Sequence, residues 1–295
     1  MKDLNGAVAV ITGGGSPRGI GRATGTLLAE NGAKLVLADV NPETLEATVK
    51  DLQGQGADVI GVPTDVSDFA SMKALATEAY DHFGKVNIAF LNAGIGGGGD
   101  LFSEEMDSWN RVIGVNYWGV LNGIKAFGQR MIDSGEDGHI LATSSGAGAT
   151  GVMYTGPGYA VTKQAVCTLM ECLYGQLRDM GSKIKATVVF PPLTKSNLAG
   201  DPEFMTFVAQ GLEAGGVPAG LAEPEEVAQF VLEAIQSDSF WAHGTVEQDA
   251  RISEGRLKTN IEWEHDILRA RAEALIARSA PDAYLWGGSG AAAPQ

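Results

Sequence analysis

Cysteine and histidine are scarce in this chain, whose 295 residues include two cysteines and four histidines. A zinc site made only of cysteines needs more of them than the chain has, and the histidines show no ligand spacing, so we expect no metal site. Cys167 and Cys172 lie five residues apart in one helical stretch and therefore on different helix faces. We expect two buried thiols in a reducing compartment.

Basic residues and long apolar runs are also lacking. The chain has 21 lysines and arginines against 36 acidic residues, which gives a net charge of −15. Nucleic acids and anionic membranes bind basic surfaces, so we expect neither as a partner. No apolar run reaches the roughly 18 residues of a membrane span, and the N-terminal stretch lacks the apolar core of a signal peptide. These absences predict a soluble, cytoplasmic protein.

What is present is an ordinary globular composition. Hydrophobic residues make up 44% of the chain and charged residues 19%. This is enough apolar material for a large core and too much for a disordered chain. The 40 glycines show no Gly-X-Y period, which excludes collagen.

Short apolar runs alternate with helical periodicity along most of the chain. Buried strands are predicted over residues 7–11, 34–38, 59–62, 87–91, 140–143 and 186–190. Helices are predicted over residues 20–30, 42–53, 225–235 and 259–278, with long apolar helices around 110–131 and 159–180. Strands that are apolar throughout belong in a parallel sheet that is covered on both faces. The pattern therefore predicts a single-domain α/β fold, a doubly wound parallel sheet with helices on both faces.

A glycine-rich turn follows the first predicted strand. The sequence TGGGSPRGIG, from Thr12 to Gly21, lies between that strand and a predicted helix. Glycines in this position let the backbone approach a pyrophosphate, which the N-terminus of the helix then stabilises. Asp39 closes the second strand, where a carboxylate can bind the adenosine ribose. The combination predicts dinucleotide binding and a sheet of the Rossmann type. The residues expected to bind the phosphates are Gly13, Gly19 and Ile20.

Two charged side chains bear on the choice of cofactor. Asp39 would repel the 2′-phosphate of NADP, whereas Arg18, beside the phosphate turn, could pair with that phosphate. Because repulsion at the ribose itself is hard to offset, we expect NAD rather than NADP.

Tyr159 and Lys163 form a second candidate site. They are four residues apart on a predicted helix and therefore lie on one face. A free tyrosine has a pKa of about 10. A neighbouring ammonium and a cationic oxidised nicotinamide would each favour the phenolate and lower the pKa of Tyr159. The pair is a candidate proton shuttle, although a surface Tyr–Lys pair has the same spacing.

Several motifs in a fixed order carry a resemblance to a known family. After the glycine turn they are Asp65-Val66, Asn92-Ala93-Gly94, Asn116 in VNYWG, Ser145 in SSGAG, and Tyr159 with Lys163 in YAVTK. With these motifs, the chain from about Gly6 to Phe190 resembles the short-chain dehydrogenase/reductase family. The remainder of the chain resembles that family only loosely.

The resemblance implies a role for each motif residue. Tyr159 would be the acid/base for the substrate oxygen, and Ser145 would orient that oxygen. Lys163 would bind the nicotinamide ribose and lower the pKa of the tyrosine. Asn116 would hold a water that links the lysine to solvent, or would simply be a helix-breaking residue bonded to the backbone. The remaining cofactor-binding residues that the resemblance implies are Asp65 with Val66 at the adenine, Asn92 with Gly94 at the adenosine ribose, and Pro191 with Thr194 and Ser196 at the nicotinamide.

The sequence offers competing side chains for two of these roles. Ser144 could replace Ser145, although Gly148, three residues after Ser145, fits the family spacing better. Tyr117 and Tyr154 are competing phenols, but neither has a lysine four residues further on.

The chain also departs from the family pattern. The glycine turn is two residues longer than usual, with Ser16-Pro17 as the insertion, which leaves its phosphate contacts open. Pro191-Pro192 replaces the usual Pro-Gly, and residues 239–244 stand in for a C-terminal strand that commonly ends in a glycine pair.

The segment after the sixth predicted strand bears on the substrate. We assign residues 1–265 to the dinucleotide-binding catalytic domain, with a substrate lid at 193–224, and residues 266–295 to a C-terminal helix and flexible tail. The apolar lid residues are Phe204, Met205, Phe207, Val208 and Leu212. They either pack onto the domain or face the site, where they would suit a bulky or aromatic alcohol. The stretches VNYWGVLNG and KSN resemble bacterial Cα-dehydrogenases of lignin-derived aryl ethers, which oxidise a benzylic alcohol with NAD.

The resemblance implies an NAD(P)-dependent alcohol dehydrogenase or ketoreductase that interconverts a secondary alcohol and a ketone. Its substrate would be a small molecule, and its long helices would pair subunits into a homotetramer or homodimer. The alternatives are an idle NAD-binding regulator or sensor, an NADP-dependent carbonyl reductase of steroid or terpene type, and a dehydratase or epimerase that retains its cofactor. The set of Ser145, Tyr159 and Lys163 favours the dehydrogenase, because a sensor does not need a phenol paired with an ammonium.

Overall fold

The structure is a computed structural model, and it describes residues 1–150, 156–199 and 221–243. The chain divides into two compact units, Met1–Asp249 and Ala250–Gln295, and every described residue lies in the first. The predicted helix at 259–278, the tail, the apolar lid residues between 204 and 212, and Tyr154 lie outside the described residues.

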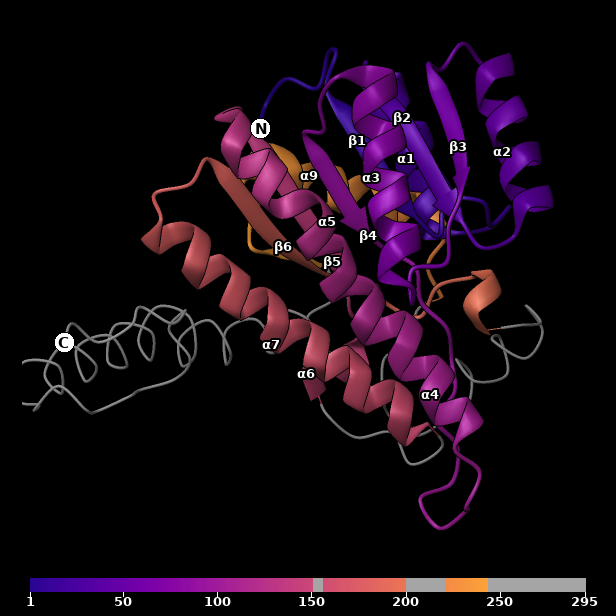
Figure 1. Cartoon of the computed structure of the whole chain (residues 1–295). Helices are drawn as coiled ribbons and strands as arrows, with labels where there is room; N and C mark the ends of the chain where they lie inside the picture. Colours follow the sequence, from indigo (N-terminus) through magenta and orange to yellow (C-terminus); the bar gives the residue numbers. More distant parts are fainter. Residues whose placement is uncertain (151–155, 200–220, 244–295) are drawn as a thin grey trace, which may run out of the picture. The chain divides into compact units, whose positions relative to one another are not determined.

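The described part of the chain contains one sheet of seven parallel strands, in the order β3-β2-β1-β4-β5-β6-β7 (Figure 1). The strands are β1 (Val8–Thr12), β2 (Lys34–Asp39), β3 (Val59–Pro63), β4 (Ile88–Leu91), β5 (Gly138–Thr143), β6 (Ile184–Phe190) and β7 (Trp241–His243). The six predicted strands are all present. The segment at 239–244 contributes β7, which pairs in parallel with β6.

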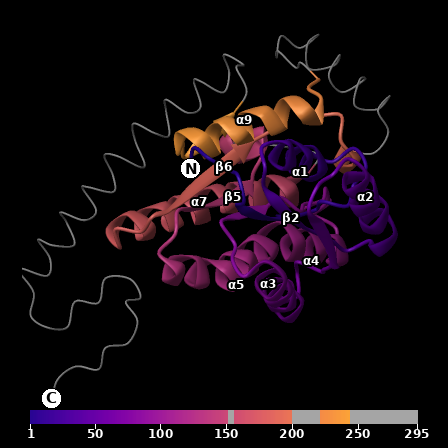
Figure 2. The same ribbon diagram turned by 90° about the horizontal axis from the view of Figure 1, so that it is seen from above.

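The helices are α1 (Ile20–Glu30), α2 (Pro42–Gly54), α3 (Phe69–Phe83), α4 (Asp107–Ile113), α5 (Gly119–Ser134), α6 (Gly146–Thr150), α7 (Pro157–Asp179) and α9 (Pro224–Ser237). A π-helical turn, Gly114–Trp118, joins α4 to α5. Helices α1, α2, α7 and α9 begin and end close to the predicted residues, whereas the helix predicted around 110–131 is divided into α4, the π-helical turn and α5. Helices α3 and α6 were not predicted. Helices α1 and α9 pack together on one face of the sheet, and α3 and α5 pack together on the other (Figure 2). This arrangement confirms the predicted doubly wound α/β fold.

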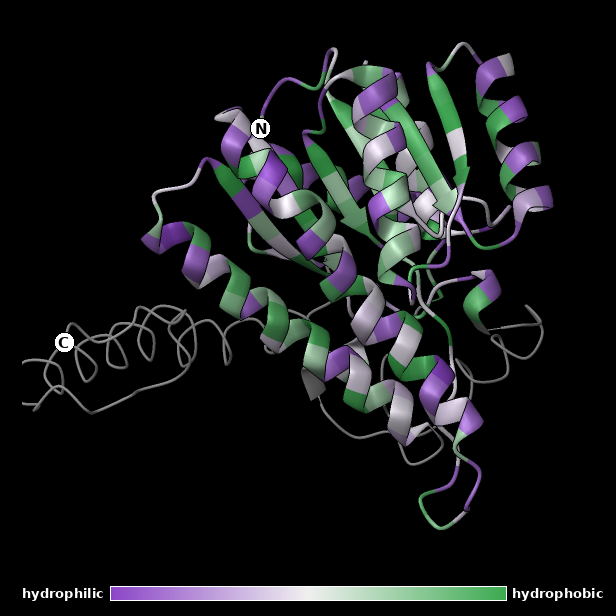
Figure 3. Ribbon diagram, viewed as in Figure 1, coloured by the Kyte–Doolittle hydropathy of each residue, from purple (hydrophilic) through white to green (hydrophobic). Residues whose placement is uncertain are grey.

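The hydrophobic core is built on the apolar strands of the sheet. All residues of β1 and β5 are buried, and the strands are coloured chiefly as hydrophobic in Figure 3. Leu35 and Leu37 on β2 are fully buried and belong to one core cluster with Leu28 of α1 and Val231 of α9. Strands that are buried on both faces need apolar side chains at successive positions, which is the pattern seen in the sequence.

The helix α3 is absent from the sequence-based prediction, although its boundary signals are ordinary. Asp68 caps its first turn by accepting hydrogen bonds from the amides of Ala70 and Ser71, and Gly84 ends it in the left-handed region.

The topology places the candidate site at one edge of the sheet. The chain runs outward from β1 through β2 to β3, then returns to β4 on the other side of β1. In such sheets, ligands bind in the crevice outside the carboxyl ends of the strands at this reversal. The glycine turn follows β1 there, and Thr143 ends β5 at the same edge.

Candidate active site

Helix α7 carries both Tyr159 and Lys163. The Lys163 side chain is only 2% exposed, and its Nζ donates a hydrogen bond to the Thr143 carbonyl at 2.9 Å. The same Nζ lies 5.5 Å from the centre of the Tyr159 ring. The ammonium is therefore held inside the protein at the carboxyl end of β5, which argues against an ordinary surface Tyr–Lys pair.

Burial is the largest cause of the pKa shifts of both Lys163 and Tyr159. It lowers the pKa of Lys163 to about 8, because the ammonium loses water. It also raises the pKa of Tyr159, and a hydrogen bond with Ser145 offsets part of that increase. In the chain by itself the pKa of Tyr159 is therefore raised and not lowered, because loss of hydration disfavours the phenolate. The lowering expected from Lys163 together with an oxidised nicotinamide stays a prediction.

The structure separates the two competing serines. Ser144 is buried, and its hydroxyl donates to the Lys163 carbonyl at 2.8 Å and lies 3.1 Å from the Cys167 sulfur. Ser145 is partly exposed, and its hydroxyl accepts from the Ala147 amide and hydrogen-bonds to Tyr159. Ser144 therefore holds α7 against the sheet, whereas Ser145 faces the phenol.

Asn116 lies inside the π-helical turn and is fully buried. Its Oδ1 accepts from the Ile95 amide at 2.8 Å, and its Nδ2 donates to the Ile95 carbonyl at 3.0 Å and to the Thr162 hydroxyl at 3.1 Å. Asn116 thus bonds to the backbone, as one alternative expected, and its role in holding a water beside Lys163 stays a prediction. π-Helical turns within α-helices are frequent at functional sites, and this one ties the segment after β4 to α7.

The lengthened glycine turn rests on β2. The amide of Gly14 donates to the Ala38 carbonyl at 3.0 Å, and that of Gly15 donates to the Asp39 carboxylate at 3.0 Å. Gly19 is the N-cap of α1 and makes no side-chain capping bond, so the first amides of this helix have no side-chain acceptor. A Cβ at Gly21 would lie 2.6 Å from the Gly13 carbonyl oxygen, so only glycine lets α1 pack this closely. Ile20 opens the helix at this point.

Arg18 contacts the segment that follows β6. Its Nε donates to the Asn197 side-chain oxygen at 3.4 Å, and the Asn197 amide donates to the Ser16 hydroxyl at 2.9 Å. Ser16 of the insertion and the neighbouring Arg18 therefore contact Asn197, while Asp39 contacts Gly15. No hydrogen bond joins Arg18 to Asp39 in the described part of the chain.

Asn92 and Gly94 follow β4 at the same edge. The Asn92 amide donates to the Thr12 carbonyl at 3.1 Å, and its oxygen accepts from the Thr143 hydroxyl at 3.0 Å. Asn92 thereby joins the ends of β1 and β5. A Cβ at Gly94 would lie 3.1 Å from Lys163 Nζ, so this glycine packs directly against the ammonium.

Asp65 and Val66 follow β3. The exposed Asp65 carboxylate accepts from the Ser67 amide at 2.9 Å and from its hydroxyl at 2.6 Å. Val66 is buried, and a Cβ at Gly119 would lie 2.8 Å from its side chain. Asp65 is accessible to an adenine, whereas the Val66 side chain packs against the start of α5.

The ends of the predicted lid meet beside the paired prolines. Thr194 is buried, forms an isolated parallel bridge with Ala222, and donates from its hydroxyl to the Pro192 carbonyl at 2.7 Å. Pro191 precedes this contact and is partly exposed. Residues 200–220, the greater part of the predicted lid, lie outside the described residues.

The two cysteines differ in exposure. Cys167 is buried beneath Ser144, as predicted, but Cys172 is exposed. The prediction of two buried thiols is wrong for Cys172, because the five-residue separation turns the second side chain away from the sheet.

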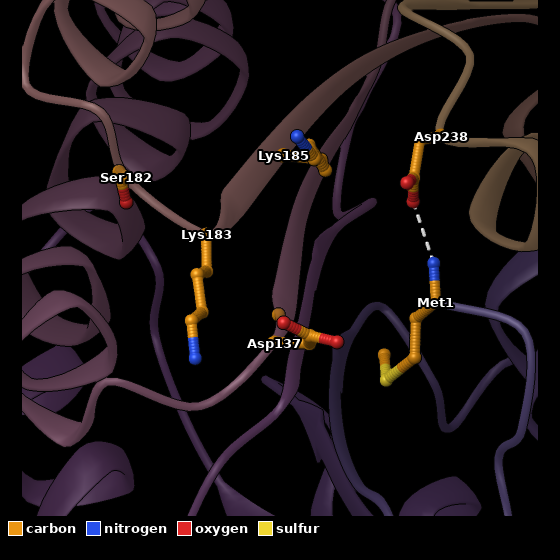
Figure 4. A pocket seen from close by; sticks show the side chains of 7 residues that line it. Met1, Asp137, Ser182, Lys183, Lys185 and Asp238 are labelled. Atoms are coloured by element: carbon orange, nitrogen blue, oxygen red, sulfur yellow. Dashed lines mark hydrogen bonds and ion pairs between the residues drawn. The ribbon is translucent and has the colours of Figure 1, made fainter.

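A hollow of about 300 Å³ lies at the opposite edge of the sheet (Figure 4). It is lined by the residues that precede or begin β5 and β6, among them Asp137, Lys183 and Lys185, together with Asp238. It is therefore remote from Tyr159.

Among the described residues, no group of three or more His, Cys, Asp and Glu side chains could hold a metal ion. No helix in the same part of the chain is long and apolar enough to cross a membrane.

Thr12 and Thr143 are site residues that the sequence analysis missed. The Thr12 hydroxyl accepts from the amides of Asn92 and Ala93, both at 3.0 Å, and the Thr143 carbonyl accepts from Lys163. Each is the last residue of a strand that ends at the site. A polar residue that ends an otherwise apolar strand is the signal that could have identified both.

Comparisons with known proteins show to which family this chain belongs. The family model described as short chain dehydrogenase matches residues 7–203. An uncharacterized oxidoreductase of Listeria monocytogenes is 41% identical over 192 residues, which cover 65% of this chain and 75% of that protein. The C alpha-dehydrogenase of Sphingobium sp. is 38% identical over 200 residues, which cover 68% of this chain and 64% of that protein.

A solved structure extends the similarity along the chain. A short-chain dehydrogenase/reductase from Burkholderia phymatum, crystallised in complex with NAD, has a TM-score of 0.74 and 34% sequence identity. The match covers 97% of this chain and all of that one.

Proposed function

Because this chain belongs to the short-chain dehydrogenase family, we propose that it interconverts a secondary alcohol and a ketone with NAD, with Tyr159 as the acid/base. The observation that carries the proposal is the convergence of Tyr159, Ser145 and Lys163 at the carboxyl end of β5. A buried ammonium beside a phenol that hydrogen-bonds to a hydroxyl is a costly arrangement, and general acid–base catalysis gives it a purpose.

The residues at the switch point fit a dinucleotide. The turn from Gly13 to Gly19 and the uncapped N-terminus of α1 would hold the pyrophosphate, since free amides and the helix dipole favour an anion. Asp39 would bind the adenosine ribose, and Asp65 would approach the adenine. Asn92 and Gly94 would line the adenosine ribose. Lys163 would hold the nicotinamide ribose, with Pro191 and Thr194 at the nicotinamide. When bound, NAD supplies the hydride acceptor.

The protein would handle the proton of the reaction. In the oxidation direction, Tyr159 as phenolate takes the proton from the alcohol oxygen while the hydride leaves the adjacent carbon, and the product is a ketone. Ser145 donates a hydrogen bond to the same oxygen and orients it. Burial opposes ionisation of Tyr159 in the chain by itself, so the positive charge of the oxidised nicotinamide would provide the driving force for the phenolate. Asn116, held between Ile95 and Thr162, would support the route from Lys163 to solvent.

The choice of NAD is supported by two contacts. The Asp39 carboxylate is fixed at the end of β2 by the Gly15 amide, where it would oppose a 2′-phosphate. The Arg18 side chain instead hydrogen-bonds to the Asn197 side chain, in the segment that follows β6.

For the substrate we propose a bulky apolar or benzylic alcohol. The similarity to the C alpha-dehydrogenase of Sphingobium sp. supports this class, as do the sequence stretches VNYWGVLNG and KSN.

The proposal is tested by following NADH absorbance with a panel of benzylic, steroidal, terpene and small aliphatic secondary alcohols. NAD and NADP are compared in parallel, and Tyr159→Phe is the control. We expect turnover with NAD on a benzylic alcohol and a loss on the order of 100-fold or more in kcat for Tyr159→Phe, because proton transfer contributes about that much. Tight NAD binding without turnover on any alcohol would contradict the proposal and favour an NAD-binding sensor.

A further inference from the structure

The N-terminus of α7 lacks a side-chain cap. Its N-cap residue, Gly156, makes no capping bond, and the first amides of any α-helix have no acceptor within the helix. Here the acceptors come from the segment after β4. The amide of Gly158 donates to the Gly98 carbonyl at 3.1 Å, and that of Tyr159 donates to the Gly97 carbonyl at 3.1 Å. A backbone segment thus caps the helix that carries the candidate acid/base.

The two backbones approach too closely for a side chain on either of them. A Cβ at Gly98 would lie 2.4 Å from the Gly158 Cα, and a Cβ at Gly158 would lie 2.5 Å from the Gly98 Cα. Gly98 also has a φ of +77°, in the left-handed region that favours glycine. These are backbone atoms, so neither contact could be relieved by rotating a side chain.

The capping segment is itself held on its other sides. The Gly98 amide donates to the Ser108 hydroxyl of α4 at 3.0 Å. Both backbone polar groups of Ile95 bond to the Asn116 amide, at 2.8 and 3.0 Å. These bonds fix the position of the segment relative to the sheet and α4. Because the segment also bonds to the first turn of α7, it determines where that turn lies.

We propose that Gly98 and Gly158 are positioning residues, whose side-chain-free contact sets the place of the Tyr159 phenol relative to Ser145 and Lys163. The inference rests on the proposed function of Tyr159 as the acid/base. Gly158 immediately precedes Tyr159, so a displacement of Gly158 moves the phenol directly. Displacements of about 1 Å in a catalytic group can cost on the order of 100-fold in rate.

The test is Gly158→Ala, assayed with the best alcohol of the panel. The added methyl pushes the first turn of α7 away from Gly98, so we expect kcat to fall on the order of 10-fold to 100-fold. The affinity for NAD, measured by fluorescence titration, stays within about twofold, because the glycine turn and Asp39 are not touched. The limb of the pH profile that reports the tyrosine moves to higher pH, because the displaced phenol loses the hydrogen bond with Ser145 that lowers its pKa.

Two further variants complete the design. Gly99→Ala is the matched control, because Gly99 lies beside Gly98 in sequence but has no heavy atom within 4 Å of the place that the added methyl would occupy; we expect wild-type kcat and pH profile. Ser108→Ala removes only the hydrogen bond to the Gly98 amide, and it serves if Gly158→Ala does not fold. We expect it to lower kcat severalfold and to shift the pH profile in the same direction, since one of the hydrogen bonds that hold the capping segment is lost.

The outcomes separate the two proposals. If Tyr159→Phe is inactive while Gly158→Ala keeps the wild-type kcat and pH profile, the positioning role is wrong and the acid/base role stands. A lower melting temperature with an unchanged pH profile would likewise overturn it, since that is the signature of a merely structural contact. If Tyr159→Phe retains full activity, the proposed function itself fails. A titration of tyrosinate absorbance, taken as the difference from Tyr159→Phe, reads the same pKa without any substrate, and an unchanged value in Gly158→Ala would also overturn the positioning role.

Discussion

The carboxylate of Asp39 accepts hydrogen bonds from the backbone amides of Gly15 and Asn41, at 3.0 and 3.1 Å. Each carboxylate oxygen can accept more than one hydrogen bond. The same group can therefore hold the lengthened glycine turn in place and still bind a ribose hydroxyl. At the residue scale, one side chain links the shape of the turn to the choice of cofactor.

Asp39→Asn tests this link. The amide oxygen can still accept from Gly15, while the negative charge that opposes a 2′-phosphate is gone. We expect the ratio of kcat/KM for NAD to that for NADP to fall by about 10-fold or more, since about 1.4 kcal/mol corresponds to a factor of ten. Arg18→Ala is the comparison, because Arg18 bonds to Asn197 instead. A ratio that responds to Arg18→Ala and not to Asp39→Asn would show that the arginine governs the ribose site.

At the element scale, β5 serves both the site and the core. Its carboxyl end offers the Thr143 carbonyl to Lys163, while His139 near its start is fully buried against β6. The His139 Nε2 lies 2.6 Å from the Thr187 hydroxyl, which donates to the Ser239 carbonyl at 2.5 Å. Because that hydroxyl donates its proton to the Ser239 carbonyl, Nε2 is a nitrogen that carries a hydrogen. Burial lowers the pKa of His139 to about 3 from 6.5.

This shift predicts a dependence of stability on pH. The unfolded chain gains a proton at His139 as the pH falls below 6.5, whereas the folded chain resists protonation down to about 3. The folded state therefore loses stability as the pH falls, by about 2 kcal/mol between pH 6.5 and 5. His139→Gln keeps an N–H donor and does not titrate in this range. Urea unfolding at both pH values should show a smaller loss for the variant, and equal losses would contradict the buried neutral histidine.

At the scale of the whole molecule, large apolar side chains remain exposed on and beside the long helices. Val161 and Met180 at the two ends of α7 are 58% and 59% exposed, and Trp118, just before α5, is 48% exposed. The resemblance to the family places subunit contacts on these helices. We propose a homotetramer or homodimer in which α5 and α7 are covered.

Light scattering after size-exclusion chromatography measures this directly. We expect two or four times the mass of the chain, and a lower mass for Met180→Glu because a charge would have to be buried at the contact. Ala47→Glu, which adds the same charge at an exposed position on α2, should leave the mass unchanged. A monomeric wild-type chain would contradict the proposal.

The sequence predicts the sheet well because the relevant signals are local. The strands are continuous apolar runs, and each helix boundary depends on a few adjacent residues, such as the glycine turn before α1 or the proline that opens α9. The helix α3 was missed even though Asp68 and Gly84 mark its ends. Residues 200–220 and everything after residue 243 lie outside the described part of the chain, so the predicted lid and C-terminal helix stay predictions.

For the candidate site, some features followed from the sequence, and others were decided only by the tertiary structure. The sequence by itself determined that Tyr159 and Lys163 share a helix face and that a carboxylate follows the second strand, because helical spacing and strand ends are properties of neighbouring residues. Only the tertiary structure decided that Ser145 and not Ser144 meets the phenol, and that burial raises the pKa of Tyr159. It also brought Gly98 against Gly158, sixty residues further along the chain. Hydration and close backbone contact depend on which distant segments the fold brings together, and no local pattern in a sequence records them.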